Sequence, residues 1–359
     1  MRYRRICSSM RGLSHNERRS SLALALVTCW LAAPPRLAAE TYTVYAKEYH
    51  HVFSSLKEPL LRIKSGDTVI TRTVDSSGRD YTGAALSGTG NPLTGPFYVE
   101  GAEPGDSISV RLDKLRLNRN WGYSSYRMSP GALNPGAAER LYKNEYGKDA
   151  VLPGRSDLIP WDLDLTRRVA NPRGLTVAGR PFDLPVKPML GCVGVATPGE
   201  TVLTSGPAGA HGGNMDYNDV TEGATLYFPV YHKGAYFYLG DGHALQGDGE
   251  GLGSGVETSL DVQFTLGLAK GKTLSNPRLV NDKYLISIAA QPEFSSSMDE
   301  GLRNANTDML RWLTAEYKLS EPAAHMLMGM AVEHKIVTYF GSIATLMPRK
   351  YVEPAAPAR

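Results

Sequence analysis

One pattern occurs twice in the first third of this 359-residue sequence: a strand-like run, a turn that contains Gly-Asp, and a second strand-like run. It fills residues 60–75 (LLRIKSGDTVITRTVD) and 95–117 (GPFYVEGAEPGDSISVRLDKLRL). Glycine lets the backbone turn sharply and aspartate bonds to nearby backbone groups, so Gly-Asp between alternating apolar residues predicts a turn between two strands. The chain has 37 Gly and 23 Pro, which indicates many turns and favours a β-rich fold.

Further strand-like runs follow this pattern along the chain, and we expect the last of them, at 284–290, to be the final core strand. The others lie at 41–46, 188–203, 224–239 and 256–268. Residues 118–187 differ, because Asn, Pro, Gly, Tyr and Arg dominate there and no clear period is present. We expect an irregular loop region in this part of the chain, which is typical of a surface excursion, a lid or a subunit contact.

The end of the chain predicts two helices. Ser297 and Glu300 have the spacing of a capping box, and apolar residues recur at helical spacing after them. Ser320 and Pro322 open a second helix that we expect to run from Glu321 to about Val337. Its histidines and methionines are expected to be surface, core or interface residues rather than ligands: His325, His334, Met326, Met328 and Met330.

The first 39 residues have the pattern of a signal peptide. Residues 1–20 hold six arginines and one acid, an apolar run fills 22–33, and small residues at Ala38 and Ala39 predict cleavage after Ala39. Lipid anchoring at Cys29 is disfavoured, because Thr28 fits poorly before a lipidated cysteine. We expect an exported protein, periplasmic or secreted, whose mature chain is one catalytic domain over 40–359.

Removal of the signal peptide changes the charge of the chain. The mature part holds 32 basic and 35 acidic residues, with no basic stripe that would favour nucleic acid, and no later run is apolar enough to span a membrane. Cys192 is then the only cysteine, so no internal disulfide can form. We expect the fold to depend on its core, with a metal or partner subunits as further support.

Histidines and carboxylates concentrate in the glycine-rich segment 208–257, in two clusters. His211 and Asp216 lie across a Gly-Gly bend, and Asp241 and His243 lie two residues apart after an apolar run. These four residues are candidate ligands of a divalent metal, since such a site needs about three ligands and an open position for water. The alternative is structural, because Gly-Asp-Gly is by itself usually a turn.

Other polar residues of the same segment are candidates for the chemistry around such a metal. Glu250 is the first candidate for the general base and Asp248 the second. Asn214 and Gln246 are neutral donors suited to a substrate carbonyl or an oxyanion. Glu222 could orient a ligand imidazole.

Several nearby residues are expected to have structural roles. We expect Asp219 and Glu257 to be turn or solvated residues, and His232 to lie at a hairpin end. Cys192 could be a nucleophile, but the surrounding MLGCVGV favours a buried strand in which cysteine packs as a small apolar residue.

These motifs resemble the acetamidase/formamidase family. The resemblance rests on PMLGCVGVA (188–196), HGGNMDYNDVTEGATLYFPV (211–230) and GDGHALQGDGE (240–250), and the segments at 91–106 and 303–320 fit it too. It covers roughly residues 42–340 and implies a β-rich fold with sandwich-like sheets, a divalent metal (zinc in some members) and a homo-oligomer. Taken with the two C-terminal helices, it predicts a β-rich α+β fold: β parts at about 40–117 and 188–290, and helices within 297–338.

The resemblance also implies an activity, the hydrolysis of short-chain amides to carboxylate and ammonia or amine. Small pockets reject close relatives poorly, so a lactam, a carbamate or an ester on the same site is an alternative substrate. A second alternative is a non-catalytic exported binding protein on an enzyme fold. Family members are largely known as cytoplasmic enzymes, so the export signal leaves the natural substrate open.

Overall fold

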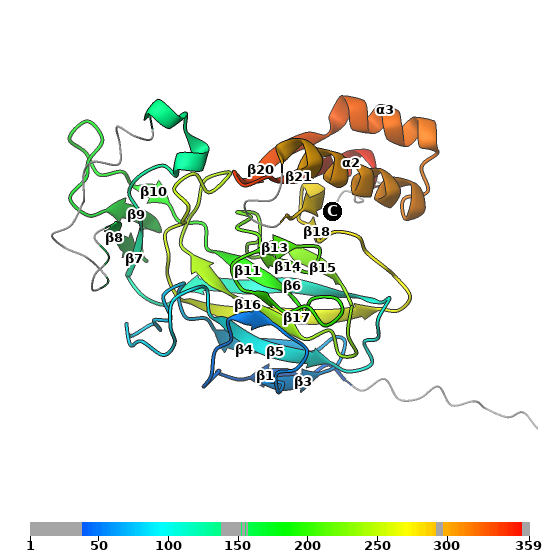
Figure 1. The fold of residues 1–359 in the computed structure, drawn as a ribbon, viewed down its shortest axis with the longest axis horizontal. Coiled ribbons are helices and arrows are strands. Elements are labelled where there is room, and N and C mark those ends of the chain that lie inside the picture. Colours follow the sequence, from blue (N-terminus) through cyan, green and yellow to red (C-terminus); the bar gives the residue numbers. More distant parts are fainter. Residues whose placement is uncertain (1–37, 138–151, 153–154, 156, 292–296, 354–359) are drawn as a thin grey trace, which may run out of the picture. The chain divides into compact units, whose positions relative to one another are not determined.

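Two β-sheets of the computed structural model enclose the main core, and all of their strands except β19 are labelled in Figure 1. The structure describes residues 38–137, 152, 155, 157–291 and 297–353. The predicted signal peptide, residues 1–39, lies outside the described residues except for Ala38 and Ala39. No helix among the described residues is long and apolar enough to cross a membrane.

The larger sheet of the described chain has nine strands, which pair antiparallel except for the parallel pair β1–β4. In spatial order they are β1 (Thr41–Thr43), β4 (Thr68–Arg72), β17 (Leu260–Ala269), β6 (Ser107–Leu117), β15 (Thr225–Pro229), β18 (Arg278–Val280), β19 (Tyr284–Ala289), β21 (Ser342–Pro348) and β20 (Glu333–Thr338).

The second sheet has six strands and carries most of the segments that the resemblance singles out. In spatial order they are β13 (Ala208–Gly209), β14 (Gly212–Asn214), β11 (Met189–Val195), β16 (Phe237–His243), β5 (Leu93–Val99) and β3 (Leu61–Ile63). A short pair joins β2 (Val52–Phe53) to β12 (Leu203–Thr204), and the 3-10 helices are η1 (Pro130–Ala132) and η2 (Arg349–Tyr351).

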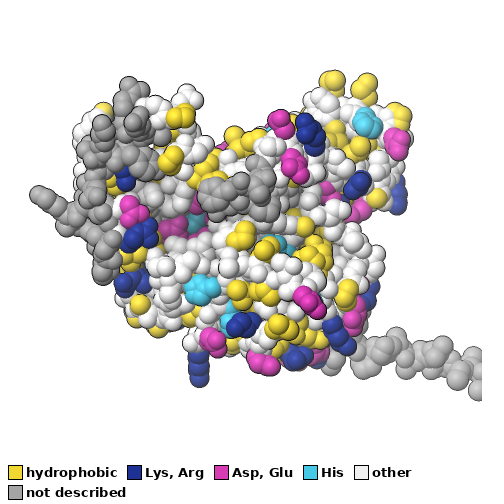
Figure 2. Space-filling model, in the orientation of Figure 1, with side chains coloured by type: hydrophobic (Ala, Val, Ile, Leu, Met, Phe, Trp, Pro, Cys, Tyr) yellow, Lys and Arg dark blue, Asp and Glu magenta, His cyan; other side chains and the backbone are white. Residues whose placement is uncertain are grey.

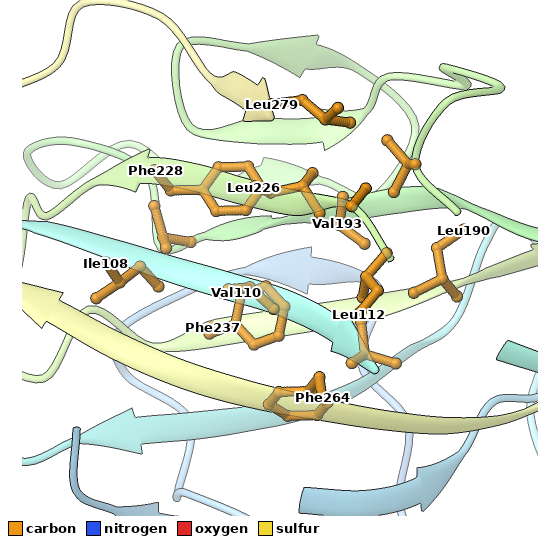
Figure 3. Packing of buried hydrophobic residues seen from close by; sticks show 14 of the residues in the cluster. Ile108, Val110, Leu112, Leu190, Val193, Leu226, Phe228, Phe237, Phe264 and Leu279 are labelled. Atoms are coloured by element: carbon orange, nitrogen blue, oxygen red, sulfur yellow. The ribbon is translucent and has the colours of Figure 1, made fainter. Parts of the chain in front are cut away.

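The core lies between the two large sheets, as the alternating pattern of β6 predicts. Ile108, Val110 and Leu112 are buried and belong to one cluster with Phe237 of β16 and Leu190 of β11. Figure 3 shows these side chains filling the space between strands of both sheets. The predicted β-rich fold with sandwich-like sheets is therefore confirmed.

The two Gly-Asp turns each carry the chain from the six-stranded sheet to the nine-stranded sheet, from β3 to β4 and from β5 to β6. In each turn the buried aspartate accepts backbone N–H groups: Asp67 from Lys64 and Glu40, and Asp106 from Glu103. The predicted turns are confirmed. The aspartates explain why the chain can turn there without leaving backbone donors unpaired.

The prediction of one long strand over 224–239 is wrong. The structure has β15 in the nine-stranded sheet and β16 in the six-stranded sheet, with a turn between them in which Gly234, Ala235 and Tyr236 all have positive φ. His232 lies in this turn, and its Nε2 is 2.7 Å from the Thr197 carbonyl oxygen. The turn holds His232 and exposed Lys233, but both of its flanks are apolar and buried, so the run could not show that the chain changes sheet there.

The described part of residues 118–187 holds more regular structure than the irregular region that the sequence predicts. They contain a four-stranded antiparallel sheet: β7 (Trp121–Ser125), β8 (Leu158–Asp164), β9 (Val169–Pro172) and β10 (Leu184–Pro185). Its strands are short and hold prolines and charged residues, which hid the period-2 pattern. Ile159, Trp161 and Leu163 form its own small core.

Both predicted C-terminal helices are present. Helix α2 (Met298–Ala315) begins after Ser297, whose hydroxyl accepts the Glu300 N–H, and α3 (Glu321–Ala331) begins after Ser320. A buried ion pair between Arg278 of β18 and Asp308 ties α2 to the sheet.

The second helix is shorter than predicted, because it ends at Ala331 and the chain continues into β20 and β21. His334 therefore lies on a strand, and 284–290 is not the final core strand. The β-branched residues Val332, Ile336 and Val337 favour a strand there over a helix.

Candidate metal centre

Five buried side chains from separate parts of the sequence meet at one place. Asp216, His243 and Glu250 each offer a ligand atom within 4.8 Å of the others, and Asp241, His243 and Glu257 form a second such group. The two groups share His243, whose side chain has no exposed surface. The four carboxylates line a cavity of about 960 Å³. On the face drawn in Figure 2, acidic side chains and a histidine lie together in a recess.

Two glycines make room for this cluster. Gly191 of β11 stands opposite Asp241 of β16, and a Cβ atom there would lie 2.3 Å from Asp216 Oδ1 and 2.5 Å from Asp241 Oδ2. A Cβ atom at Gly255 would lie 2.4 Å from His243 Nδ1. These approaches are shorter than van der Waals contact allows, so the carboxylates and the imidazole can meet only because both positions lack a side chain.

Three of the five residues have a backbone conformation that L-amino acids rarely adopt. The φ angle is +45° at Asp216, +56° at Asp241 and +50° at Glu250. A non-glycine residue in this region costs on the order of 1–3 kcal/mol and persists only where the surrounding structure holds it in place. The surrounding sheets thus hold these carboxylates in place at a cost in stability, which is typical of a functional site.

Burial and mutual repulsion raise the pKa values of the carboxyl groups. Burial and then the Asp241 charge raise the pKa of Asp216 to about 8, and burial and then the Asp216 charge raise the pKa of Glu250 well above its ordinary value. Burial and the Glu257 charge also raise the pKa of Asp241. Burial by itself lowers the pKa of His243, but Glu257 and Asp241 outweigh it and hold that pKa well above its usual range. The cluster therefore has an excess of negative charge, which a bound cation or added protons would neutralise.

Several polar atoms of the cluster have no hydrogen-bond partner although they are fully buried: Asp216 Oδ1, Asp241 Oδ1, His243 Nε2 and Glu257 Oε2. A buried acceptor without a partner costs about 1–3 kcal/mol, and more when it is charged. A divalent cation bound among these atoms would give each of them a partner and offset the carboxylate charge. Imidazole nitrogen and carboxylate oxygen are donors that zinc and related cations accept, so the residues present fit such an ion.

The structure brings together four of the residues that the sequence singles out: Asp216, Asp241, His243 and Glu250. His211 belongs to neither group. Its ring is buried edge-on against Phe53, with ring centroids 4.9 Å apart, and burial lowers its pKa to about 4. Asp248 lies at the surface, where it accepts from Asn218 and pairs with Lys335.

The two candidate amide donors have bonds that the sequence does not indicate. Asn214 lines the cavity, where it accepts from Asn91 Nδ2 at 2.7 Å and donates to Asp216 Oδ2. Gln246 is not among the residues that line the cavity, and it bonds instead to His243 and to the Asp216 carbonyl oxygen. Both amides hold members of the cluster.

Glu257 is the residue of the cluster that sequence reasoning missed, since we expected a turn or solvated residue. It is only 5% exposed, and its Oε1 lies 3.1 Å from His243 Nε2. A carboxylate just before a strand looks the same in a sequence whether it faces solvent or a cation. The one available signal in the sequence was Gly255, because glycine allows the backbone to approach another group closely.

Glu222 and Cys192 take no part in the cluster. Glu222 pairs with Arg116 and accepts the Leu115 N–H, so it orients no ligand imidazole. Cys192 is buried in β11, and its thiol donates to the Ser205 carbonyl oxygen at 3.3 Å. It is absent from the residues that line the cavity, in keeping with a packed cysteine.

Comparison with known proteins places the segment that carries the cluster in one family. Residues 193–338 match the model of the Acetamidase/Formamidase family. The chain is 29% identical over 219 residues to a formamidase of Methylophilus methylotrophus, an alignment that covers 50% of this chain and 51% of that protein. The chain spans about half the length of the curated relatives it matches.

Solved structures extend the similarity over nearly the whole chain. A predicted acetamidase/formamidase from Thermoanaerobacter tengcongensis aligns with a TM-score of 0.70 at 29% identity, over 88% of this chain and 98% of that one. An acetamidase from Yersinia enterocolitica aligns with a TM-score of 0.71 at 25% identity, over 89% and 95% of the two chains. On the motifs, the fold and these matches together, the chain is similar to the acetamidase/formamidase family, whose model residues 193–338 match.

Proposed function

We propose that this protein is a hydrolase that depends on a divalent cation, most simply zinc, and cleaves a linear short-chain amide to a carboxylate and ammonia or an amine. One observation carries the proposal: buried carboxylate and imidazole atoms without hydrogen-bond partners converge beside a cavity. The relatives named as formamidase and acetamidase support amides as the substrate class.

His243, Asp241 and Glu257 on one side and Asp216 on the other would hold the cation, with Glu250 beside them. Such an ion, when bound, makes water a stronger nucleophile and polarises a carbonyl group. His211 belongs to neither group and packs against Phe53, but its Nε2 is buried without a hydrogen-bond partner, so its role as a ligand stays a prediction.

Glu250 is the best-placed residue to move a proton, since it lines the cavity and has a raised pKa. A carboxylate of high pKa accepts a proton from attacking water and can return it to the leaving nitrogen. Asn214 keeps one N–H beyond the bond it donates to Asp216, and this N–H is available to the substrate carbonyl.

The test uses the full-length protein purified without chelators. We expect about one tightly held divalent ion per chain and release of ammonia from formamide or acetamide. Glu250→Gln should lower kcat by about 10²–10⁴-fold, the usual contribution of a general base. The matched control Asp248→Asn, at the surface of the same loop, should leave kcat near the wild-type value. Absence of metal and of amidase activity after zinc reconstitution would refute the proposal.

The size of the cavity favours a second candidate substrate range. The cavity of about 960 Å³ is larger than formamide or acetamide would fill, because cavities of roughly 300–1,000 Å³ hold drug-sized ligands. A larger amide, a lactam, a carbamate or an ester could therefore be the natural substrate. A panel of these compounds, ranked by kcat/KM with Glu250→Gln as background, separates them. If no member of the panel turns over, a non-catalytic binding protein becomes the better explanation.

We further propose that the chain is exported, on the strength of the basic and apolar pattern of residues 1–39. Intact-mass measurement of protein recovered from outside the cytoplasm should give a chain that begins at Glu40. A full-length mass in the cytoplasmic fraction would contradict export.

We also propose a homo-oligomer. Helix α3 exposes Met326 and Met330, at 65% and 83%, and Ile336 is half exposed on the edge strand β20. Light scattering should give a multiple of the chain mass that falls towards one chain in Met330→Asp, whereas a wild-type monomer would contradict the proposal.

A further inference from the structure

Gln246 follows His243 by three residues and makes two bonds with the cluster. Its Oε1 lies 2.8 Å from His243 Nδ1, and its Nε2 donates to the backbone carbonyl oxygen of Asp216 at 2.5 Å. A carbonyl oxygen can only accept, so the NH₂ end of the amide must face Asp216. The oxygen end is then fixed towards His243, since the reverse orientation would set two acceptors against each other.

This orientation determines which ring nitrogen of His243 carries a proton. Oε1 has no proton to give, so Nδ1 must be the donor of the bond between them. In a neutral imidazole the proton on Nδ1 leaves Nε2 with a free lone pair. Nε2 is buried without a hydrogen-bond partner, 3.1 Å from Glu257 Oε1 and 3.4 Å from Asp241 Oδ1.

We propose that Gln246 is a positioning residue that holds the proton of the His243 ring on Nδ1, so that Nε2 offers its lone pair to the cation. The proposal rests on the proposed function, because Nε2 and the two carboxylate oxygens beside it need a proton or a cation between them, and the proposed function places a cation there. It also reassigns Gln246: the side chain is absent from the cavity lining and its N–H is directed at Asp216, so it is not a donor to the substrate.

The same side chain connects the two halves of the site. Through it the carbonyl group of Asp216, a residue with φ of +45°, is tied to the ring of His243 on β16. A change at Gln246 therefore acts on the geometry of two candidate ligands while touching neither the cavity nor a substrate.

The first test is zinc affinity, measured by competition with a chromophoric chelator on the intact protein. Gln246→Leu removes both bonds and should weaken Zn²⁺ binding about 10–100-fold, the usual effect of losing the partner of a ligating histidine. Gln246→Glu keeps an acceptor for Nδ1–H but sets a carboxylate oxygen against the Asp216 carbonyl oxygen, so it should recover only part of that affinity. Asn218→Ala is the matched control, because Asn218 supports the same loop through the Gln246 backbone oxygen without touching the ring. It should bind zinc like the wild type.

The second test uses only the wild-type protein, so it remains valid if Gln246→Leu does not fold. Nitrogen-15 spectra of zinc-loaded wild-type protein with labelled histidine should show His243 protonated at Nδ1 and metal-bound at Nε2. A proton on Nε2, or wild-type zinc affinity in folded Gln246→Leu, would overturn the assignment of Gln246 alone. Failure of the wild type to bind zinc would instead overturn the proposed function.

Discussion

At the scale of single residues, the candidate site depends on where side chains are missing as much as on where they are present. Gly191 leaves the space in which the carboxylates of Asp216 and Asp241 meet, and Gly255 leaves the space for the His243 ring. The sequence shows the glycines and the ligand types. It could not show that Glu257 turns inward, because the burial of that residue depends on a strand contact with Tyr123 and His243 from distant segments.

Gly191→Ala tests the close packing of the carboxylates. The added methyl group would collide with Asp216 and Asp241, so we expect loss of bound metal and a destabilisation of about 1–3 kcal/mol, as is typical of overpacking. Metal analysis and urea unfolding measure the two effects. Gly247→Ala is the control, because no atom lies within 4 Å of a Cβ atom at that position. An unchanged metal content in Gly191→Ala would show that the carboxylates do not need this space.

Glu257→Gln and Glu222→Gln form a matched pair of glutamate substitutions. Glu257 faces His243 inside the cluster, whereas Glu222 pairs with Arg116 away from it. We expect Glu257→Gln to lower zinc affinity about 10–100-fold, and Glu222→Gln to leave it unchanged. The same chelator competition measures both, and equal losses in the two variants would mean that Glu257 is no ligand.

At the scale of elements, local patterns predicted local structure well and long-range arrangement poorly. The Gly-Asp turns and the Ser297 cap were predictable because the bonds involved span only a few residues. The change of sheet between β15 and β16 was not, since both strands are apolar and a turn between them looks the same whether it joins strands of one sheet or of two. The end of α3 was missed because no glycine or proline ends the helix, and only the β-branched residues after Ala331 indicate the change to β20.

A substitution in the buried pair of Arg278 and Asp308 tests how α2 is attached to the nine-stranded sheet. Asp308 accepts two bonds from Arg278 and one from Ser287. Asp308→Ala leaves the buried Arg278 guanidinium with the Glu316 carboxylate as its remaining ionic partner and should cost about 3 kcal/mol, the low end for a broken buried pair. The exposed pair of Arg173 and Asp162 is the control, for which Asp162→Ala should cost at most about 1 kcal/mol. Equal urea midpoints in the two variants would contradict the role of the buried pair.

At the scale of the whole molecule, the buried carboxylates couple folding to pH and to metal. Asp216 has its pKa raised to about 8 in the folded chain, so it binds its proton more tightly there than in the unfolded chain. Its contribution to stability is full below about pH 4 and is lost as the pH rises towards about 8. Deprotonation of the metal-free cluster therefore opposes folding, and a bound cation removes that effect.

We accordingly expect zinc to raise the melting temperature of the chelator-treated protein more at about pH 8 than at about pH 5. Differential scanning fluorimetry with and without Zn²⁺ measures the difference. Asp216→Asn cannot ionise and should reduce the pH dependence of the metal-free protein. A zinc shift that is larger at low pH would contradict the assignment of these carboxylates as ligands.

The central claim is that His243 and the carboxylates of Asp216, Asp241 and Glu257 hold a divalent cation. The most direct test is the anomalous difference map of crystals grown with zinc. We predict a strong peak at His243 Nε2 with carboxylate oxygens around it, and no peak there in His243→Gln. A wild-type map without a peak at His243, or with its peak at His211 instead, would contradict the account.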